Sequence, residues 1–182
     1  MTDHAAIFRD YQPFDAPDGW ASATDVALAT EPFTCVTFEM AGQIFAVDVS
    51  QVREILDMQP ISRLPNAPGD LLGMIDVRGE GIALVDLASR LGVGGTPDPD
   101  QGRIIVFEFG QAENQVAVGV IADKVLSVVD LTAADVEPAP RTMVRWQGEA
   151  VRGVTRIGGQ IVLLLSLDLV FDAQPSDAFD FS

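Results

Sequence analysis

The stretch GMIDVRGEGIALVDL, residues 73–87, places an aspartate, an arginine and two interior glycines in an otherwise apolar run. An arginine inside an apolar strand is seldom buried alone. Arg78 must therefore reach a carboxylate of its own chain or the polar groups of a bound molecule. Its planar guanidinium can donate paired hydrogen bonds, which suits recognition of acidic or amide groups. We interpret Arg78 as a binding residue.

The histidine, cysteine and aspartate residues of the sequence do not form a catalytic arrangement. The one histidine, His4, lies in the first residues, where neither a triad nor a histidine metal cluster can be assembled. The one cysteine, Cys35, lies in a predicted strand without basic neighbours in the sequence, which is typical of a packing residue. Asp86 precedes the turn DLASRL and is expected to cap it. The sequence predicts no catalytic residue, no metal and no cofactor, and indicates a binding module.

The composition excludes several classes of partner. The 182 residues are 48% hydrophobic and carry a formal charge of -16, which argues against nucleic acid because that binding needs cationic side chains. The longest apolar run, 161–171, contains Asp168 and is about half a bilayer span, so no membrane insertion is expected. The acidic start lacks the basic flank and apolar run of a signal peptide. We expect a cytoplasmic protein.

Short strands separated by turn signals form the body of the chain. Strands are predicted at 33–40 and 43–49, joined by a tight turn at Gly42, and at 103–109 and 115–121, joined by GQAEN. The segment GTPDPDQG, residues 95–102, is too rich in proline, glycine and aspartate for either regular structure and divides the chain into halves.

The two halves contain the same unit. A shift of 80 residues places GMIDVRGEGIALVDL on GVTRIGGQIVLLLSL, so that Gly79 meets Gly159. A shift of 73 places FAVDVSQVREI on VGVIADKVLSV, so that Val52 meets Val125. Each copy is predicted to run as a hairpin, a third strand, a second hairpin and a short helical turn. The counterpart of Arg78 is a glycine, so the unit itself does not need the arginine.

Units of about five short strands favour small closed barrels, because closure removes exposed strand edges. We predict a mainly β fold of two pseudo-repeated five-stranded SH3-like barrels, side by side, with short helical turns. The expected organisation has a flexible acidic extension at 1–31, a core at 32–172 and an acidic tail at 173–182. The first barrel is expected mainly from 32–92 and the second mainly from 102–172, with exchange of strands left open.

Four blocks carry a family resemblance. In order, they are VTFEMAGQIFAVDVSQVREIL, LPNAPGDLLGMIDVRGEGIALVDL, VGVIADKVLSVVDLTAADVEPAP and VRGVTRIGGQIVLLLSLDLV. Together they cover about 33–171, and the chain resembles the CheW-like coupling domain of bacterial chemotaxis. The resemblance implies intertwined barrels and a non-enzymatic scaffold that links a CheA-type histidine kinase to the cytoplasmic hairpin tips of chemoreceptors in arrays. It also implies that the receptor hairpin lies in a groove between the barrels, and that the kinase regulatory domain docks on the first barrel.

The resemblance also implies roles for individual residues. Receptor binding is implied for Arg78 in DVRG, which matches the family's NLRG, and for Val52, Gly73, Gly119 and Val125. Kinase binding is implied for Glu54, Ile55, Leu56 and Gly79. The alternative, that these valines and the glycines at 73 and 119 are core or turn residues, stays open. Asp76 replaces the family's asparagine and bears on which receptor is bound.

Two other functions are compatible with the sequence. One is an adaptor of a chemosensory-like pathway that controls pili, biofilm or development. The other is a barrel that binds a small molecule or hydrolyses a substrate with paired carboxylates. The last of these would require a concave site where acids of shifted pKa converge.

Overall fold

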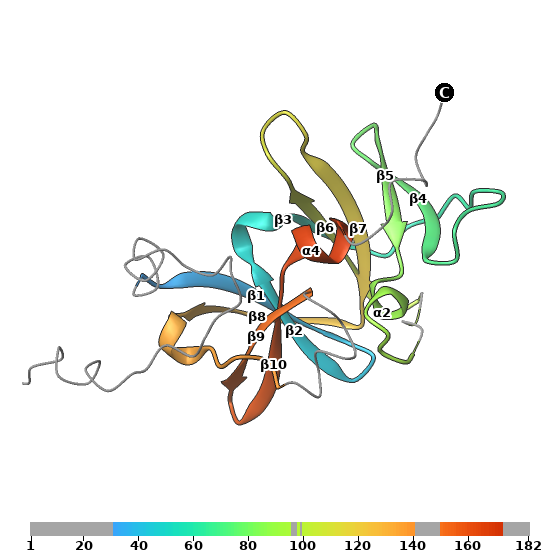
Figure 1. The fold of residues 1–182 in the computed structure, drawn as a ribbon. Helices are drawn as coiled ribbons and strands as arrows, with labels where there is room; N and C mark the ends of the chain where they lie inside the picture. The colour runs from blue at the N-terminus through green and yellow to red at the C-terminus, as the bar shows by residue number, and fades with distance from the viewer. Residues whose placement is uncertain (1–30, 96–97, 99, 141–149, 173–182) are drawn as a thin grey trace, which may run out of the picture.

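The computed structural model describes residues 31–95, 98, 100–140 and 150–172, which form two five-stranded sheets (Figure 1). The predictions for His4, for the extension up to residue 30 and for the tail from residue 173 lie outside these residues. Within the described part of the chain, no helix is long and apolar enough to cross a membrane.

Each sheet has a simple order of strands. Sheet A runs β8 (Lys124–Leu131), β1 (Phe33–Met40), β2 (Gln43–Asp48), β10 (Gln160–Leu165) and β9 (Val151–Ile157). Sheet B runs β3 (Val52–Asp57), β6 (Arg103–Phe109), β7 (Val116–Ala122), β5 (Glu80–Val85) and β4 (Leu71–Val77). Short helices follow the strands at η1 (Val49–Gln51), α2 (Leu87–Arg90), η2 (Ala133–Asp135) and α4 (Leu167–Asp172). The predicted mainly β fold with two five-stranded units and short helical turns is confirmed.

The two halves of the chain exchange their leading hairpins. Hairpin β1–β2 pairs with β8 and β10 of the second half, and hairpin β6–β7 pairs with β3 and β5 of the first. Neither sheet therefore coincides with residues 32–92 or 102–172. The chain changes sheets through the three residues of η1, so β3 begins a new sheet instead of folding back on β2. The alternation of apolar residues along a strand indicates which face of the strand is buried. It does not indicate which other strand pairs with it, so the sequence left the exchange open.

The register of the strands reproduces the repeat found in the sequence. Both the second hairpins and the third strands pair alike in the two copies, and a β-bulge follows the equivalent valine pair in each third strand. The matching pairs are Val77↔Glu80 with Ile157↔Gln160, and Val52↔Phe107 with Val125↔Phe38. The molecule is thus two copies of one unit related by a pseudo-twofold axis.

Three apolar clusters hold the sheets. One lies inside sheet A, one inside sheet B, and the largest lies between them. Phe38 and Phe107 hold equivalent positions in the two copies, and their ring centroids are 6.1 Å apart, so their contact marks the pseudo-twofold axis. Each is fully buried, and burying a phenylalanine side chain contributes about 1.5–3 kcal/mol.

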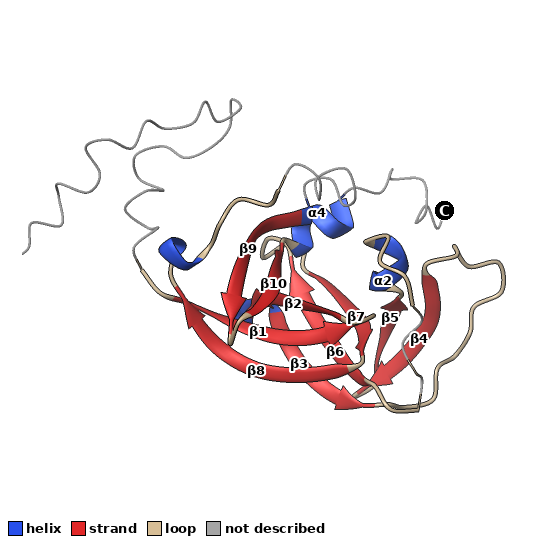
Figure 2. Ribbon diagram, turned by 90° about the horizontal axis from the view of Figure 1, so that it is seen from below, coloured by secondary structure: helices blue, strands red, loops and turns tan. Residues whose placement is uncertain are grey.

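The helical turns close the core between the sheets from one side. Figure 2 shows α2 and α4 on the same side of the strands, and Leu87 and Leu167 at their starts are fully buried. Asp86 accepts a hydrogen bond from the backbone N–H of Ser89 at 3.0 Å, so it caps α2 as expected. These turns fix the ends of β5 and β10 against the core.

Candidate partner-binding surface

Arg78 lies in a turn whose backbone favours glycine. Arg78 and Gly79 have φ of +54° and +84°, and the equivalent Gly158 and Gly159 have +57° and +82°. Two positive φ values define the tight turn that matches the twist of a hairpin. A non-glycine residue in this region costs about 1–2 kcal/mol. The Oδ1 atom of Asp76 accepts a hydrogen bond from the Gly79 N–H at 2.9 Å and fixes the strained turn.

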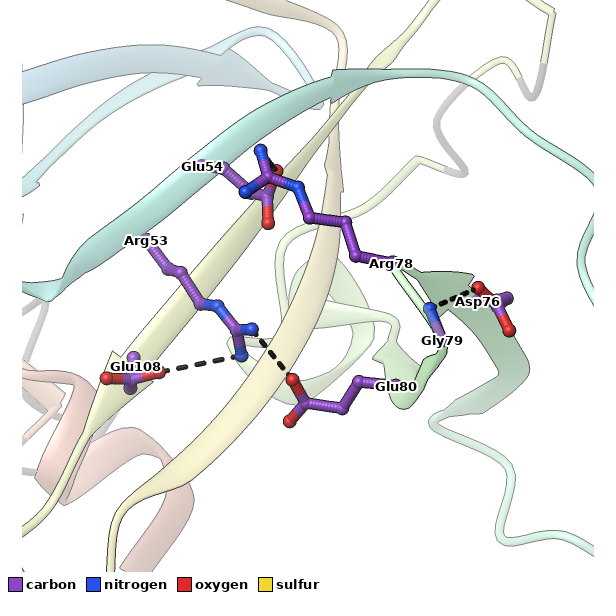
Figure 3. Close-up of polar contacts among 7 residues, drawn as sticks. All are labelled: Arg53, Glu54, Asp76, Arg78, Gly79, Glu80 and Glu108. Carbon is purple, nitrogen blue, oxygen red and sulfur yellow. Dashed lines mark hydrogen bonds and ion pairs between the residues drawn. The ribbon is translucent and has the colours of Figure 1, made fainter.

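The Arg78 side chain extends from this turn over Glu54 of β3 (Figure 3). Its Nη2 atom lies 3.2 Å from Glu54 Oε2. The arginine side chain is 82% exposed and the glutamate 15%, so Arg78 covers the carboxylate and still offers most of its donors to solvent. A predicted receptor-binding residue and a predicted kinase-binding residue therefore contact each other.

A second ion pair lies beside the first. Arg53 Nη2 is 2.7 Å from Glu80 Oε2, and Arg53 Nη1 is 3.6 Å from Glu108 Oε2. The hydrogen bond with Glu80 raises the pKa of Arg53, and the same bond lowers the pKa of Glu80. Sequence reasoning missed these three residues. The available signal was that Arg53 occupies the place of an apolar residue, Leu126, in the other copy.

The other predicted kinase contacts alternate along β3. Ile55 is 42% exposed, whereas Leu56 is half-buried and packs against the cluster inside sheet B. Gly79 is exposed at the turn, beside Arg78. Glu54 and Leu56 thus share one face of β3, next to Gly79 at the adjoining turn, and Ile55 projects from the opposite face.

The two predicted groove valines border the core between the sheets. Val52 and Val125 are half-buried, pack against that core, and pair with Phe107 and Phe38 at the pseudo-twofold axis. Leu126 and Val128 continue along β8, with 44% and 63% of their surface exposed. Sequence reasoning missed these two, although β8 is rich in apolar residues yet mostly exposed. Val128 pairs with Val36 of that core, whereas Leu126 lies at the bulge of β8. We call Val52, Val125 and Val128 the intersheet strip.

The two predicted groove glycines are buried. At Gly73, with φ +148°, an added Cβ would lie 2.5 Å from the Ser62 backbone oxygen, where Ser62 and Met74 exchange two hydrogen bonds of 2.8 Å. At Gly119 an added Cβ would lie 3.0 Å from Leu84 Cδ1. Both glycines therefore have a packing role. A contact with a receptor stays a prediction for them.

Other groups that could do chemistry have structural explanations. Burial raises the pKa of the Cys35 thiol to about 11, so it is protonated near neutral pH. A cavity of about 220 Å³ beside β9 is lined by Asp135 and Glu137, among others. Hydrogen bonds from Thr132 lower the pKa of Asp135 and identify it as part of a capping box. Among the described residues, no group of three or more His, Cys, Asp or Glu could hold a metal ion.

Comparisons with known proteins agree on one family. A family model described as the CheW-like domain matches residues 34–174. "Chemotaxis protein CheW" of Rhizobium meliloti is 31% identical over 143 residues, which cover 79% of this chain and 90% of that protein. "Chemotaxis protein CheW" of Klebsiella aerogenes is 25% identical over 156 residues, covering 86% of this chain and 92% of that one. The crystal structure of the scaffolding protein TtCheW from Thermoanaerobacter tengcongensis has a TM-score of 0.68 at 26% identity, covering 79% of this chain and 95% of that chain.

Proposed function

The chain belongs to the CheW-like family, and we propose that it joins chemoreceptors to a CheA-type histidine kinase through adjoining parts of one surface. It is a chemotaxis scaffold, and its likeness to chemotaxis proteins favours this function over control of pili, biofilm or development. The observation that carries the two-partner proposal is the contact between Arg78 and Glu54, which brings together residues expected to serve different partners.

The receptor-binding part is proposed to combine Arg78 with the intersheet strip. A helical hairpin can place an apolar face on such a strip, while Arg78 donates hydrogen bonds to carboxylate or amide groups at its rim. The strip runs across the pseudo-twofold axis, because Val52 and Val125 are equivalent residues of the two copies. Gly73 and Gly119 would act indirectly, by fixing the backbone that shapes this part of the surface.

The kinase-binding part is proposed to lie on β3 and the adjoining turn. Ile55 would be the apolar anchor, because it is the exposed large apolar side chain among Glu54, Ile55, Leu56 and Gly79. Its partner would be the regulatory domain of the kinase. Arg78 adopts a strained backbone conformation that glycine adopts without strain at the equivalent position of the second copy. The presence of an arginine despite this strain supports a binding role for the turn.

The remaining properties follow from a scaffolding function. We propose that the protein has no catalytic activity of its own and binds no cofactor or metal. It would act in the cytoplasm and be recruited to receptor arrays, where both partners are held.

Copurification from native cells is the direct test, because it identifies both partners at once. Wild-type protein should capture a CheA-type kinase and a chemoreceptor. The Arg78→Ala variant keeps the positive φ but lacks the guanidinium, so it should lose the receptor and retain the kinase. Undiminished receptor capture by this variant would refute the role of Arg78. Capture of neither partner by the wild type would refute the proposed function.

A further inference from the structure

Two ion pairs connect β3 to the β4–β5 hairpin, and the other copy of the unit does without both. The four residues are Arg53, Glu54, Arg78 and Glu80, and their counterparts in the second copy are Leu126, Ser127, Gly158 and Gln160. The two copies share the hairpin register, the turn conformation and the β-bulge. A sheet of this shape therefore forms without these charges, and stability alone does not account for them.

The pair of Arg53 and Glu80 flanks the proposed kinase-binding part. Glu80 directly follows Gly79, and Arg53 directly precedes Glu54. The bulge between Val52 and Glu54 removes Arg53 from the regular pairing and redirects its side chain toward Glu80, as Figure 3 shows. Glu80 keeps 52% of its side chain exposed, so a docked protein can reach its carboxylate.

The charges around this pair do not balance. Three carboxylates, of Glu54, Glu80 and Glu108, form ion pairs with the two guanidiniums of Arg53 and Arg78. Glu80 is the most exposed of the three carboxylates that form ion pairs in this group. A partner that places a positive charge opposite Glu80 is favoured, and one that places a negative charge there is repelled.

We propose that Glu80, positioned by Arg53, is a specificity-determining residue that selects a kinase whose docked surface presents an arginine or lysine to it. The inference rests on the proposed function, because it assumes that the kinase docks on β3 and the adjoining turn. The competing explanation is a purely internal ion pair that fastens β3 to β5. Exchanging the two charges separates these explanations.

The test is the double variant Arg53→Glu with Glu80→Arg. It preserves an internal ion pair and the net charge of the protein, but it reverses the charge that faces a partner. The matched control exchanges Asp57 and Arg103, an ion pair of 3.3 Å at the far end of the same β3–β6 pairing. Affinity is measured by calorimetry against the regulatory domain of the CheA-type kinase encoded in the same genome, with urea unfolding of every variant.

The double variant should stay folded, with a somewhat lower urea midpoint because its new carboxylate faces Glu108. It should bind the regulatory domain at least about tenfold more weakly, while the control binds normally. One Arg→Glu or Lys→Glu change on the kinase domain should restore its binding. Unchanged affinity of the double variant would overturn the inference and leave the proposed function intact. Absence of wild-type binding would overturn the proposed function itself.

If the double variant does not fold, the single variant Glu80→Gln replaces it. Glutamine already occupies this position in the second copy, so the backbone accepts it. A loss of kinase affinity with normal unfolding supports selection by Glu80. Normal affinity refutes it.

Discussion

The substitution Arg78→Gly separates binding from stability at one position. Arg78 has φ +54°, where the second copy has glycine at +57°. Replacing it by glycine relieves about 1–2 kcal/mol of backbone strain. The same change loses an ion pair with an arginine that is 82% exposed, for which about 0.2–1 kcal/mol is typical. It also gives the unfolded chain more freedom, which costs about 0.4–1 kcal/mol.

These terms nearly cancel, so the free energy of unfolding of Arg78→Gly should lie within about 1 kcal/mol of the wild type. For a protein of this size the melting temperature should change by no more than about 2–4 °C. Receptor binding should fall much further. Hydrogen bonds from a charged group contribute about 1.5–3 kcal/mol, which corresponds to a loss of roughly ten- to a hundredfold in affinity.

The assay combines urea unfolding with titration of a chemoreceptor cytoplasmic fragment. Gly158→Arg is the matched control, because it puts an arginine into the equivalent turn, where an added Cβ meets no atom within 4 Å. It should lower the free energy of unfolding by about 0.5–1 kcal/mol through the same strain and leave receptor affinity unchanged. A variant Arg78→Gly that loses more than about 2 kcal/mol and still binds the receptor would show that the arginine is structural.

Three further substitutions test other parts of the structure. Gly73→Ala should destabilise the protein by about 1–3 kcal/mol in urea unfolding, because its Cβ would clash with crossing backbone, whereas Gly69→Ala meets open space and should be near neutral. Ile55→Asp should weaken kinase binding by a few kcal/mol with little change in unfolding, and Leu169→Asp, at a similarly exposed position, should leave it unchanged. Because burial raises the pKa of Cys35 from 9.0 to about 11, its contribution to stability is present below pH 9 and is lost as the pH rises toward 11. Cys35→Ala should flatten that part of the pH–stability curve, and an unchanged curve would contradict this source of the dependence.

The sequence predicted the strands and tight turns well, because the positions of glycines and the alternation of apolar residues determine structure over a few neighbouring residues. The hairpin corner at Gly42 and the shared corner at Gly79 and Gly159 follow from the need for positive φ. The repeat predicted the equivalence of Val52 and Val125, which the strand register bears out.

What the sequence could not predict depends on neighbours distant in the chain. The partner of Arg78 was left open between a carboxylate of the chain and a bound molecule, and the structure supplies Glu54 while leaving the arginine largely exposed. Arg53 and Glu80 carried no local motif, because their significance arises only when a bulge and a turn meet across the barrel. The burial of Gly119 against Leu84 likewise depends on β7 joining a sheet from the other half of the chain.

The reciprocal exchange of hairpins sets the order in which the protein can fold during its synthesis. Strand β2 ends at Asp48 and its neighbour β10 begins at Gln160, so sheet A cannot be completed until the segment up to residue 165 has left the ribosome. Pairing over such a separation in sequence slows folding, because the intervening chain must be closed into a loop first. Until then the β1–β2 hairpin exposes Phe38 and Phe45, which are fully buried in the finished protein. A nascent chain whose synthesis stops before β10 keeps an open sheet edge at β2. Such chains are prone to aggregate and are targets for chaperones.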